Sequence, residues 1–297
     1  MLSRVFLSRT DAMSVYFPLI ILILTIASAI IALVDKFCFE KKRRAALEAF
    51  PDYASMDKKA QKAFMKPPLL ADYARSLFLV FLIVLVVRSF IVAPFRVPTG
   101  SMLPTIQLND FLLVNKFAYG VRFPVFNTKI FNVGEPKTGD VVVFRYPPYP
   151  GVDYIKTVIG VPGDHISYIN KQLYINGKKV PTHFLQTTIE PDNRNLALLY
   201  PKHKNLAGIV KAYRQDIGGH EHLIYDSPIV PPTNFKNLVV PKGEYLVMGD
   251  NRGNSEDSRY WGFVPEKNLI GKAFMVVFSW DAQLHKVRWD RLGKFLP

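Results

Sequence analysis

Two long apolar segments lie in the first third of the chain. The first, residues 16–34, reads YFPLIILILTIASAIIALV and contains no charged side chain. As an α-helix it would span roughly 28 Å at ~1.5 Å per residue, close to the thickness of the membrane hydrocarbon layer. The charged stretch DKFCFEKKRR follows at once, which is typical of a retained span rather than a cleaved signal sequence. We predict a transmembrane helix at 16–34, preceded by an N-terminal tail at 1–15. A buried helix of a soluble core is the alternative, but such helices rarely lack a polar face.

The second apolar segment, residues 76–95, reads SLFLVFLIVLVVRSFIVAPF and is interrupted only by Arg88. An arginine near the end of a spanning helix can extend its guanidinium group to the membrane interface. We therefore predict a second transmembrane helix at 76–94. A re-entrant or interfacial segment is the alternative.

From residue 95 onward the pattern changes to short β-rich runs separated by Pro, Gly and Asp turn signals. The runs include DFLLVNKF, DVVVFRYP, DYIKTVIGV, EYLVMGD and AFMVVFSW, and Asn176-Gly177 predicts a tight hairpin turn. Residues 183–240 are richer in Pro, Asn and His and have weak periodicity, which predicts an insertion built on loops. The predicted fold class is mainly β: an antiparallel β-sheet domain at 95–297 with two N-terminal transmembrane α-helices.

The positive charge of the chain is concentrated between the two apolar segments. The formal net charge is +14, and residues 35–75 contain ten Lys and Arg, whereas only Arg4 and Arg9 precede the first segment. The positive-inside rule places this basic loop at 35–75 in the cytoplasm and the β domain on the opposite side. The same excess predicts contact with anionic phospholipid. No nucleic-acid-binding motif accompanies it, so nucleic acid is not an expected partner.

Several short motifs carry little weight. HEH at 220–222 offers two metal ligands without a third at a suitable spacing, and a solvated loop is the expected structure there. SMDK at 55–58 has the serine–lysine spacing of β-lactamases but lies in the predicted cytoplasmic loop without the companion motifs. No HExxH, CxxC, phosphate-binding Gly loop or GxSxG occurs, and Cys38 is the only cysteine. We expect no metal, no cofactor and no intrachain disulfide.

Three other stretches suggest a serine nucleophile with an unusual base. PTGSMLPT contains Ser101, and DYIKTVIGVPGD contains Lys156 as the only charge between Asp153 and Asp164. A lysine can accept a serine proton when burial lowers its pKa. MGDNRGNSEDSRYWGFVP collects acidic, basic and hydroxyl groups that would suit the orientation of such a lysine. Taken singly, these stretches are more typical of a turn serine, a solvent-facing strand lysine and a salt-bridged turn.

Taken together, the stretches resemble the motifs of bacterial type I signal peptidases (leader peptidases). FRVPTGSMLPTI, GDVVVFRYP, DYIKTVIGVPGD and GDNRGNSEDSRYWGFVP occur in that family's order, after two apolar segments as in its Gram-negative members. The resemblance covers about residues 76–182 and 239–278 and is poor across the insertion. It implies a membrane-bound serine endopeptidase of the bacterial inner membrane, with its catalytic domain at 95–297 on the periplasmic side. It also implies removal of signal peptides from secretory precursors after Ala-X-Ala, by a Ser/Lys dyad without metal or cofactor.

The resemblance further implies roles for individual residues. Ser101 matches the nucleophile, Lys156 the general base, and Ser255 a serine that hydrogen-bonds the lysine and orients it. Thr99 matches a hydroxyl residue that stabilises the oxyanion beside the backbone N–H of Ser101. The residues expected to support the lysine's surroundings are Asp257, Arg259, Asp250 and Arg252. The positions that match the pockets for the P1 and P3 side chains are Val97, Pro98, Met102, Ile106, Tyr154 and Ile155.

Two other functions compete with this hypothesis. A non-catalytic, membrane-anchored β domain that binds exported proteins would be indifferent to the loss of Ser101. A self-cleaving Ser/Lys repressor of the DNA-damage response shares a related β core, but that class has a DNA-binding domain and no span. The apolar segment at 16–34 argues against the repressor.

Overall fold

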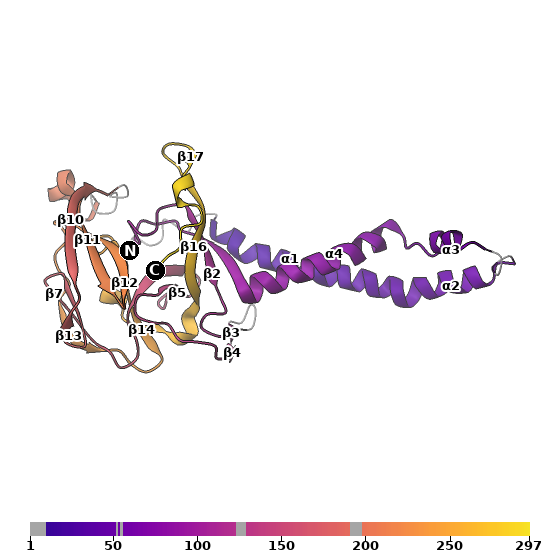
Figure 1. Cartoon of the computed structure of the whole chain (residues 1–297), viewed down its shortest axis with the longest axis horizontal. Helices are drawn as coiled ribbons and strands as arrows, with labels where there is room; N and C mark the ends of the chain where they lie inside the picture. Colours follow the sequence, from indigo (N-terminus) through magenta and orange to yellow (C-terminus); the bar gives the residue numbers. More distant parts are fainter. Residues whose placement is uncertain (1–9, 52, 54–55, 123–128, 191–197) are drawn as a thin grey trace. The chain divides into compact units, whose positions relative to one another are not determined.

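The structure is a computed structural model that describes residues 10–51, 53, 56–122, 129–190 and 198–297. Contacts within the chain divide it into two compact units, Met1–Ser89 and Phe90–Pro297, and each is described by itself (Figure 1). Residues 1–9 of the predicted N-terminal tail lie outside the described residues.

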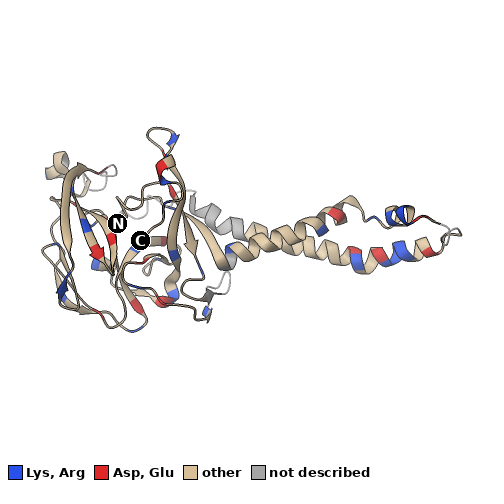
Figure 2. Cartoon of the chain, in the orientation of Figure 1, with Lys and Arg blue, Asp and Glu red and all other residues tan. Residues whose placement is uncertain are grey.

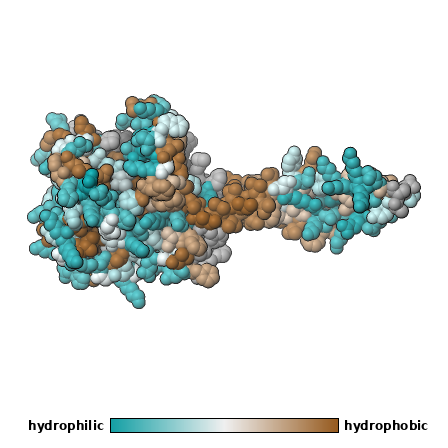
Figure 3. All heavy atoms as spheres, in the orientation of Figure 1, coloured by the Kyte–Doolittle hydropathy of each residue, from teal (hydrophilic) through white to brown (hydrophobic). Residues whose placement is uncertain are grey.

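The N-terminal unit consists of helices. Helix α1 (Thr10–Val34) continues through a π-helical turn (Asp35–Phe39) into α2 (Glu40–Glu48), and α3 (Lys58–Phe64) and α4 (Leu69–Val86) follow. Helices α1 and α4 pack along each other. The stretches Leu19–Glu48 and Leu69–Val86 are long and apolar enough to cross a membrane, judged by length and composition. Figure 2 shows many Lys, Arg, Asp and Glu positions along α2 and α3, and Figure 3 shows a hydrophobic belt on the α1–α4 pair.

Two details of this unit differ from the sequence-based expectation. The predicted loop at 35–75 is largely helical, and the second apolar helix begins at Leu69 and ends at Val86 rather than covering 76–94. Pro68 is the N-cap residue of α4. A proline fits at the start of a helix because no intrahelical hydrogen bond needs its missing N–H there. At the other end Pro94 lacks an N–H donor, and the chain forms a π-helical turn (Val87–Ile91) and then a strand.

A buried acidic side chain joins the helices of this unit. Asp35 is 2% exposed, and its carboxylate accepts hydrogen bonds from Arg43 at 2.8 and from Arg75 at 2.8 Å. Arg75 on α4 also contacts Glu40 on α2 at 2.9 Å. The pairing of a buried carboxylate by two guanidinium groups compensates its loss of hydration. These ion pairs connect α4 to the segment that follows α1.

An eight-stranded antiparallel sheet forms the centre of the second unit. Its strands run in the order β1 (Val92–Arg96), β2 (Asp110–Asn115), β16 (Leu269–Asp281), β5 (Val141–Arg145), β6 (Asp153–Gly160), β14 (Glu244–Met248) and β15 (Val264–Pro265), with β17 (Lys286–Val287) paired to β16. The fold is therefore mainly β with N-terminal helices, as predicted.

Both faces of this sheet are covered where β5 and β6 lie. Val141 and Val143 pack in one apolar cluster, and Val142 and Phe144 pack in another. Because successive strand residues point to opposite faces, the run VVVF supplies both clusters. The last six residues of β6 are likewise buried, so a lysine in this strand cannot reach solvent as an ordinary surface lysine does.

The predicted insertion at 183–240 proves to be mostly β structure, not loops. Strands β10 (Thr182–Ile189), β11 (Ile209–Ile217) and β12 (His220–Asp226) form a three-stranded antiparallel sheet. Strand β13 (Phe235–Val239) joins β7 (His165–Ile169), β8 (Gln172–Ile175) and β9 (Lys178–Lys179) in another sheet, while β3 (Val121–Arg122) pairs with β4 (Lys129–Phe131). The side chains of β10 are mostly exposed, so the strand is held by cross-strand pairing and not by burial of one face. Such a strand has only weak hydrophobic periodicity, and for this reason the sequence predicted loops.

The HEH motif also differs from the sequence-based expectation. It lies on β12 rather than in a solvated loop, and His222 is fully buried whereas His220 is exposed. Among the described residues, no group of three or more His, Cys, Asp or Glu side chains is placed to hold a metal ion.

Candidate active site

The structure brings Ser101 and Lys156 into contact across 55 residues of sequence. Ser101 lies in the turn segment between β1 and β2, and Lys156 lies in the middle of β6. The Nζ atom of Lys156 is 2.7 Å from the Oγ atom of Ser101. Nζ also lies 5.3 Å from the centre of the Tyr154 ring, on the same face of the strand.

Burial changes the acid–base properties of Lys156. The residue is 3% exposed. Loss of hydration lowers its pKa from the ordinary 10.5 to about 8, against the opposing charges of Asp257, Asp250 and Glu256. A substantial fraction of the amine is therefore neutral near pH 8, and a neutral amine is the form that can accept a proton.

The loop after β14 contains a buried ion pair whose charges act on Lys156. Asp257 is fully buried, and Arg259 donates to its two carboxylate oxygens, each at 2.8 Å. Burial works to raise the pKa of Asp257, but the charge and hydrogen bonds of Arg259 and the N–H of Gly249 hold it below the ordinary value. Asp257 is also the N-cap of the short helix α6 (Ser258–Trp261), so the pair fixes the end of the loop.

Ser255 makes a different contact from the one expected. Its Oγ donates to Asp257 Oδ2 at 2.8 Å, and within the described part of the chain no hydrogen bond joins Ser255 to Lys156. Ser255 is thus part of the Asp257–Arg259 cluster. The direct hydrogen bond to Lys156 that the resemblance implied for Ser255 is therefore not present among the described residues.

Asp250 and Arg252 point to different neighbours. Asp250 is fully buried and accepts a 2.7 Å hydrogen bond from Thr157, the residue that follows Lys156 on β6. Arg252 is 2% exposed and donates to Gln215 on β11 at 2.7 Å. Asp250 therefore braces the strand that carries the lysine, and Arg252 connects the loop to the inserted sheet.

The backbone of the nucleophile segment is held by the same loop. The N–H of Asn251 donates to the carbonyl of Ser101 at 3.1 Å, and its side-chain Nδ2 donates to the carbonyl of Gly100 at 3.0 Å. Gly249 makes this approach possible, since a Cβ atom there would lie 2.1 Å from Ser255 Oγ and 2.5 Å from the Ser101 carbonyl oxygen.

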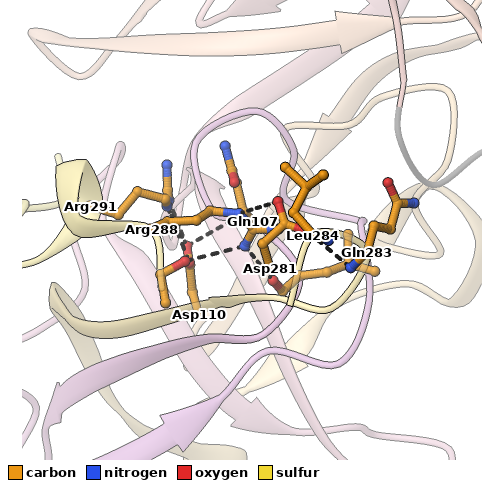
Figure 4. A network of polar contacts seen from close by, with 9 residues as sticks. Gln107, Asp110, Asp281, Gln283, Leu284, Arg288 and Arg291 are labelled. Carbon is orange, nitrogen blue, oxygen red and sulfur yellow. Dashed lines mark hydrogen bonds and ion pairs between the residues drawn. The ribbon is translucent and has the colours of Figure 1, made fainter. Parts of the chain in front are cut away.

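The far end of the nucleophile segment is anchored by a C-terminal arginine. Arg291 is 4% exposed, donates to both oxygens of the buried Asp110 and also donates to the Thr105 carbonyl at 3.0 Å. Asp110 in turn accepts from the N–H of Gln107, as Figure 4 shows. The turn segment is thus held at its start by Asn251 and at its end by Arg291.

Thr99 and the expected pocket residues differ in their exposure. Thr99 is exposed, and its Oγ1 is 3.5 Å from Ser101 Oγ. Pro98 is exposed as well, and Tyr154 is half-buried and stacks on Tyr146 with ring centres 4.3 Å apart. The four remaining residues are buried together in one apolar cluster: Val97, Met102, Ile106 and Ile155.

Sequence reasoning missed several residues that shape this site. Asn251, Gly249 and Thr157 all lie inside the quoted motifs. The predicted site consisted mainly of charged and hydroxyl side chains from these motifs and did not include these three residues. Glu190, which contacts Asn251, is 61 residues away in sequence and lies in the insertion, where no motif pointed to it.

The comparisons with known proteins agree on one family. Residues 70–280 match a family model described as signal peptidase, peptidase S26. The chain is 42% identical to a signal peptidase I of Pseudomonas aeruginosa over 289 residues, which are 90% of this chain and 94% of that one. It is also 42% identical to a signal peptidase I of Pseudomonas fluorescens over 299 residues, 95% of this chain and 99% of the other. A crystal structure of a signal peptidase I from Enterococcus faecalis matches 48% of this chain and 98% of its own at 28% identity, with a TM-score of 0.27.

Proposed function

Since the chain belongs to the bacterial signal peptidase I family, peptidase S26, and is a membrane-anchored hydrolase that removes signal peptides, we propose that Ser101 and Lys156 form its catalytic dyad. The observation that carries this proposal is the 2.7 Å contact between Ser101 Oγ and a lysine amine that is 3% exposed. Family membership also speaks against a non-catalytic binding domain.

The proposed mechanism follows from that contact. Neutral Lys156 accepts the Ser101 proton while Oγ attacks the scissile carbonyl carbon of the precursor. The resulting ammonium group returns the proton to the departing amine, and an acyl-enzyme forms. Lys156, neutral again, takes a proton from water as the water attacks the ester. It then gives this proton to Ser101 Oγ as the acyl–Oγ bond breaks and the signal peptide leaves with a free carboxyl group. The backbone N–H of Ser101 and the Thr99 hydroxyl, 3.5 Å from Oγ, would hold the oxyanion.

The surrounding residues would hold the lysine in place and stabilise its charged form. Asp257, paired with Arg259, and Asp250, bonded to Thr157, provide negative charge near Nζ. Their charges stabilise the ammonium form that appears transiently, while burial favours the neutral amine in the resting enzyme. Ser255 would act through the Asp257 loop.

We place the catalytic unit on the periplasmic side of the inner membrane. The ten basic residues of 35–75 favour a cytoplasmic position for the segment between the two spans. Ser101 follows Arg88 by 13 residues, a distance of at most ~45 Å for an extended chain. The dyad would thus operate near the phospholipid surface, where the end of a signal peptide leaves the membrane.

Substrate preference should follow from the tight apolar cluster beside the nucleophile. Val97, Met102 and Ile106 are each 0% exposed and Ile155 is 4% exposed, so a substrate side chain that enters here finds little space. We expect cleavage after Ala-X-Ala, because larger side chains would force apart a packed core. In an assay with the detergent-solubilised full chain, replacement of the P1 alanine of a secretory precursor by Phe should reduce kcat/KM by roughly 10²-fold or more. Equal cleavage of the two precursors would contradict this assignment of the pocket.

The pH dependence of the rate provides a separate test of the base. Since only neutral Lys156 can accept the proton and its pKa is lowered to about 8, log(kcat/KM) should rise with slope one up to about pH 8 and then level off. Glu256 raises the pKa of Lys156 by its negative charge and is exposed. Its Oε1 accepts a hydrogen bond from Tyr146 and its Oε2 accepts one from Tyr154. In Gln, the amide oxygen could accept the bond from Tyr146, and the NH₂ group could donate to the Tyr154 hydroxyl oxygen.

Glu256→Gln should therefore move the acidic limb to lower pH while leaving the plateau similar. A limb with a midpoint near that of an exposed lysine, or one that Glu256→Gln moves to higher pH, would contradict Lys156 as a buried base.

A further inference from the structure

The inserted sheet approaches the nucleophile through one carboxylate. Glu190 directly follows β10 and is 1% exposed. Its Oε1 accepts hydrogen bonds from Asn251 Nδ2 at 2.5 Å and from Asn254 Nδ2 at 2.9 Å. Both asparagines belong to the loop that carries Ser255 and Asp257. A residue of the insertion thus contacts the loop at the centre of the active site.

The Asn251 amide relays this contact to the nucleophile. The same Nδ2 that donates to Glu190 also donates to the Gly100 carbonyl at 3.0 Å, while the Asn251 backbone N–H donates to the Ser101 carbonyl at 3.1 Å. Asn251 is fully buried. Two hydrogen bonds in series therefore join Glu190 to the carbonyl group of the peptide whose N–H belongs to Ser101.

Strand β12 of the same sheet ties the two active-site segments to each other. Pro104, in the nucleophile segment, forms an isolated β-bridge with Ile224, and Asn251 forms one with Tyr225. The Tyr225 N–H donates to the Asp250 carbonyl at 2.9 Å, and the Arg252 N–H donates to the Tyr225 carbonyl at 2.7 Å. Neighbouring residues of one strand therefore hold both the segment of Ser101 and the loop of Asn251.

The acceptor role of Glu190 has a specific consequence for Asn251. Oε1 of Glu190 accepts hydrogen bonds from Asn251 and Asn254, so it selects the NH₂ end of the Asn251 side chain. A flipped amide would place Oδ1 against both Glu190 and the Gly100 carbonyl, three acceptors with no donor among them. Burial makes such a mismatch costly. Glu190 thus determines that Asn251 presents a donor to the Gly100 carbonyl.

We propose that Glu190 is a positioning residue for the nucleophile: through Asn251 it holds the Gly100–Ser101 peptide so that Ser101 Oγ stays within reach of Lys156. This role would give the insertion a part in catalysis. It rests on the proposed function of Ser101 and Lys156.

The test compares kcat and KM of full-length variants in detergent. Glu190→Ala should lower kcat about 10- to 100-fold, because a nucleophile misplaced by about 1 Å costs that order of rate. KM should stay within about twofold, since none of the expected pocket residues is changed. Glu190→Gln should recover most of the lost rate, because its amide oxygen can accept from Asn251.

Ile217→Ala is the matched control for loss of stability. Ile217 is fully buried on β11 of the same sheet but packs in an apolar cluster away from Ser101 and Asn251. It should lower the melting temperature and leave kcat near the wild-type value. If Glu190→Ala does not lower kcat beyond the effect of Ile217→Ala, or if Glu190→Gln is as slow as Glu190→Ala, the proposal is wrong.

A second variant approaches the same link from the other end. Asn251→Ala should reproduce the loss of kcat, and the double variant Glu190→Ala/Asn251→Ala should be no slower than the slower single variant. Multiplicative losses in the double variant would overturn the proposal. A normal kcat for Asn251→Ala would overturn it even if Glu190→Ala did not fold. Activity retained by Ser101→Ala would instead disprove the dyad, so failure of one proposal is distinguishable from failure of the other.

Discussion

Ser101→Ala and Lys156→Ala should each lower the rate of precursor cleavage by roughly 10⁴-fold or more, to near the limit of detection. The first removes the atom that attacks, and the second removes the only amine at hydrogen-bonding distance from it among the described residues. Because the two side chains act as one unit, the double variant should be no slower than the slower single variant. The measurement is single-turnover cleavage of a secretory precursor by the detergent-solubilised full chain.

The controls for this prediction separate chemistry from folding. Ser101→Ala deletes one oxygen at a half-buried position and should leave the melting temperature nearly unchanged. Lys156→Met keeps much of the side-chain volume and removes the buried amine, so it should be inactive yet at least as stable as the parent. Near-normal turnover by a folded Lys156→Met variant would show that another group is the base.

Thr99→Val should lower kcat by roughly 10²–10³-fold, equivalent to ~3–4 kcal/mol of transition-state stabilisation. The substitution keeps the shape of the side chain and removes the hydroxyl, whose oxygen lies 3.5 Å from Ser101 Oγ. The effect should fall on kcat with little change in KM, because the hydrogen bond strengthens only as the carbonyl oxygen becomes charged. Steady-state kinetics on a short signal-sequence peptide would measure both constants.

Two further measurements decide the role of Thr99. Thr99→Ser restores the donor and should retain most of the activity, and the exposed position predicts no loss of melting temperature in either variant. If Thr99→Val is folded and its kcat lies within a few-fold of the parent, the backbone N–H of Ser101 is the main oxyanion donor. Thr99 would then be a turn residue.

Local patterns in the sequence were sufficient to predict the apolar helices, several strands of the central sheet and one hairpin turn. Long apolar runs indicated the two apolar helices, and the β-rich runs around Leu112, Val142 and Val158 indicated strands of the central sheet. Asn176 and Gly177 both adopt positive φ, at 51° and 76°, which is the turn geometry their types predicted. These features depend only on residues that are neighbours in the chain, so they can be predicted from one sequence.

The boundaries of the second helix and the structure of the insertion depended on more distant interactions. Arg75 is held by Asp35, 40 residues earlier, so the helix extends through a segment that was read as a loop. Strand β10 has mostly exposed side chains and exists because β11 pairs with it. Neither partner is visible from the local pattern, because pairing between distant segments leaves no periodicity in either of them.

For the candidate site, the sequence by itself determined which side chains were available, through motifs whose order matches a known family. Only the tertiary structure decided how they are arranged. It buried Lys156 in a strand whose two faces are both covered, directed the hydroxyl of Ser255 to Asp257, and brought Glu190 to Asn251. The physical reason is that burial and hydrogen-bond direction are set by the partners that folding assembles. A lysine in a strand is a solvated cation or a buried base according to what covers it, and that covering comes from segments elsewhere in the chain.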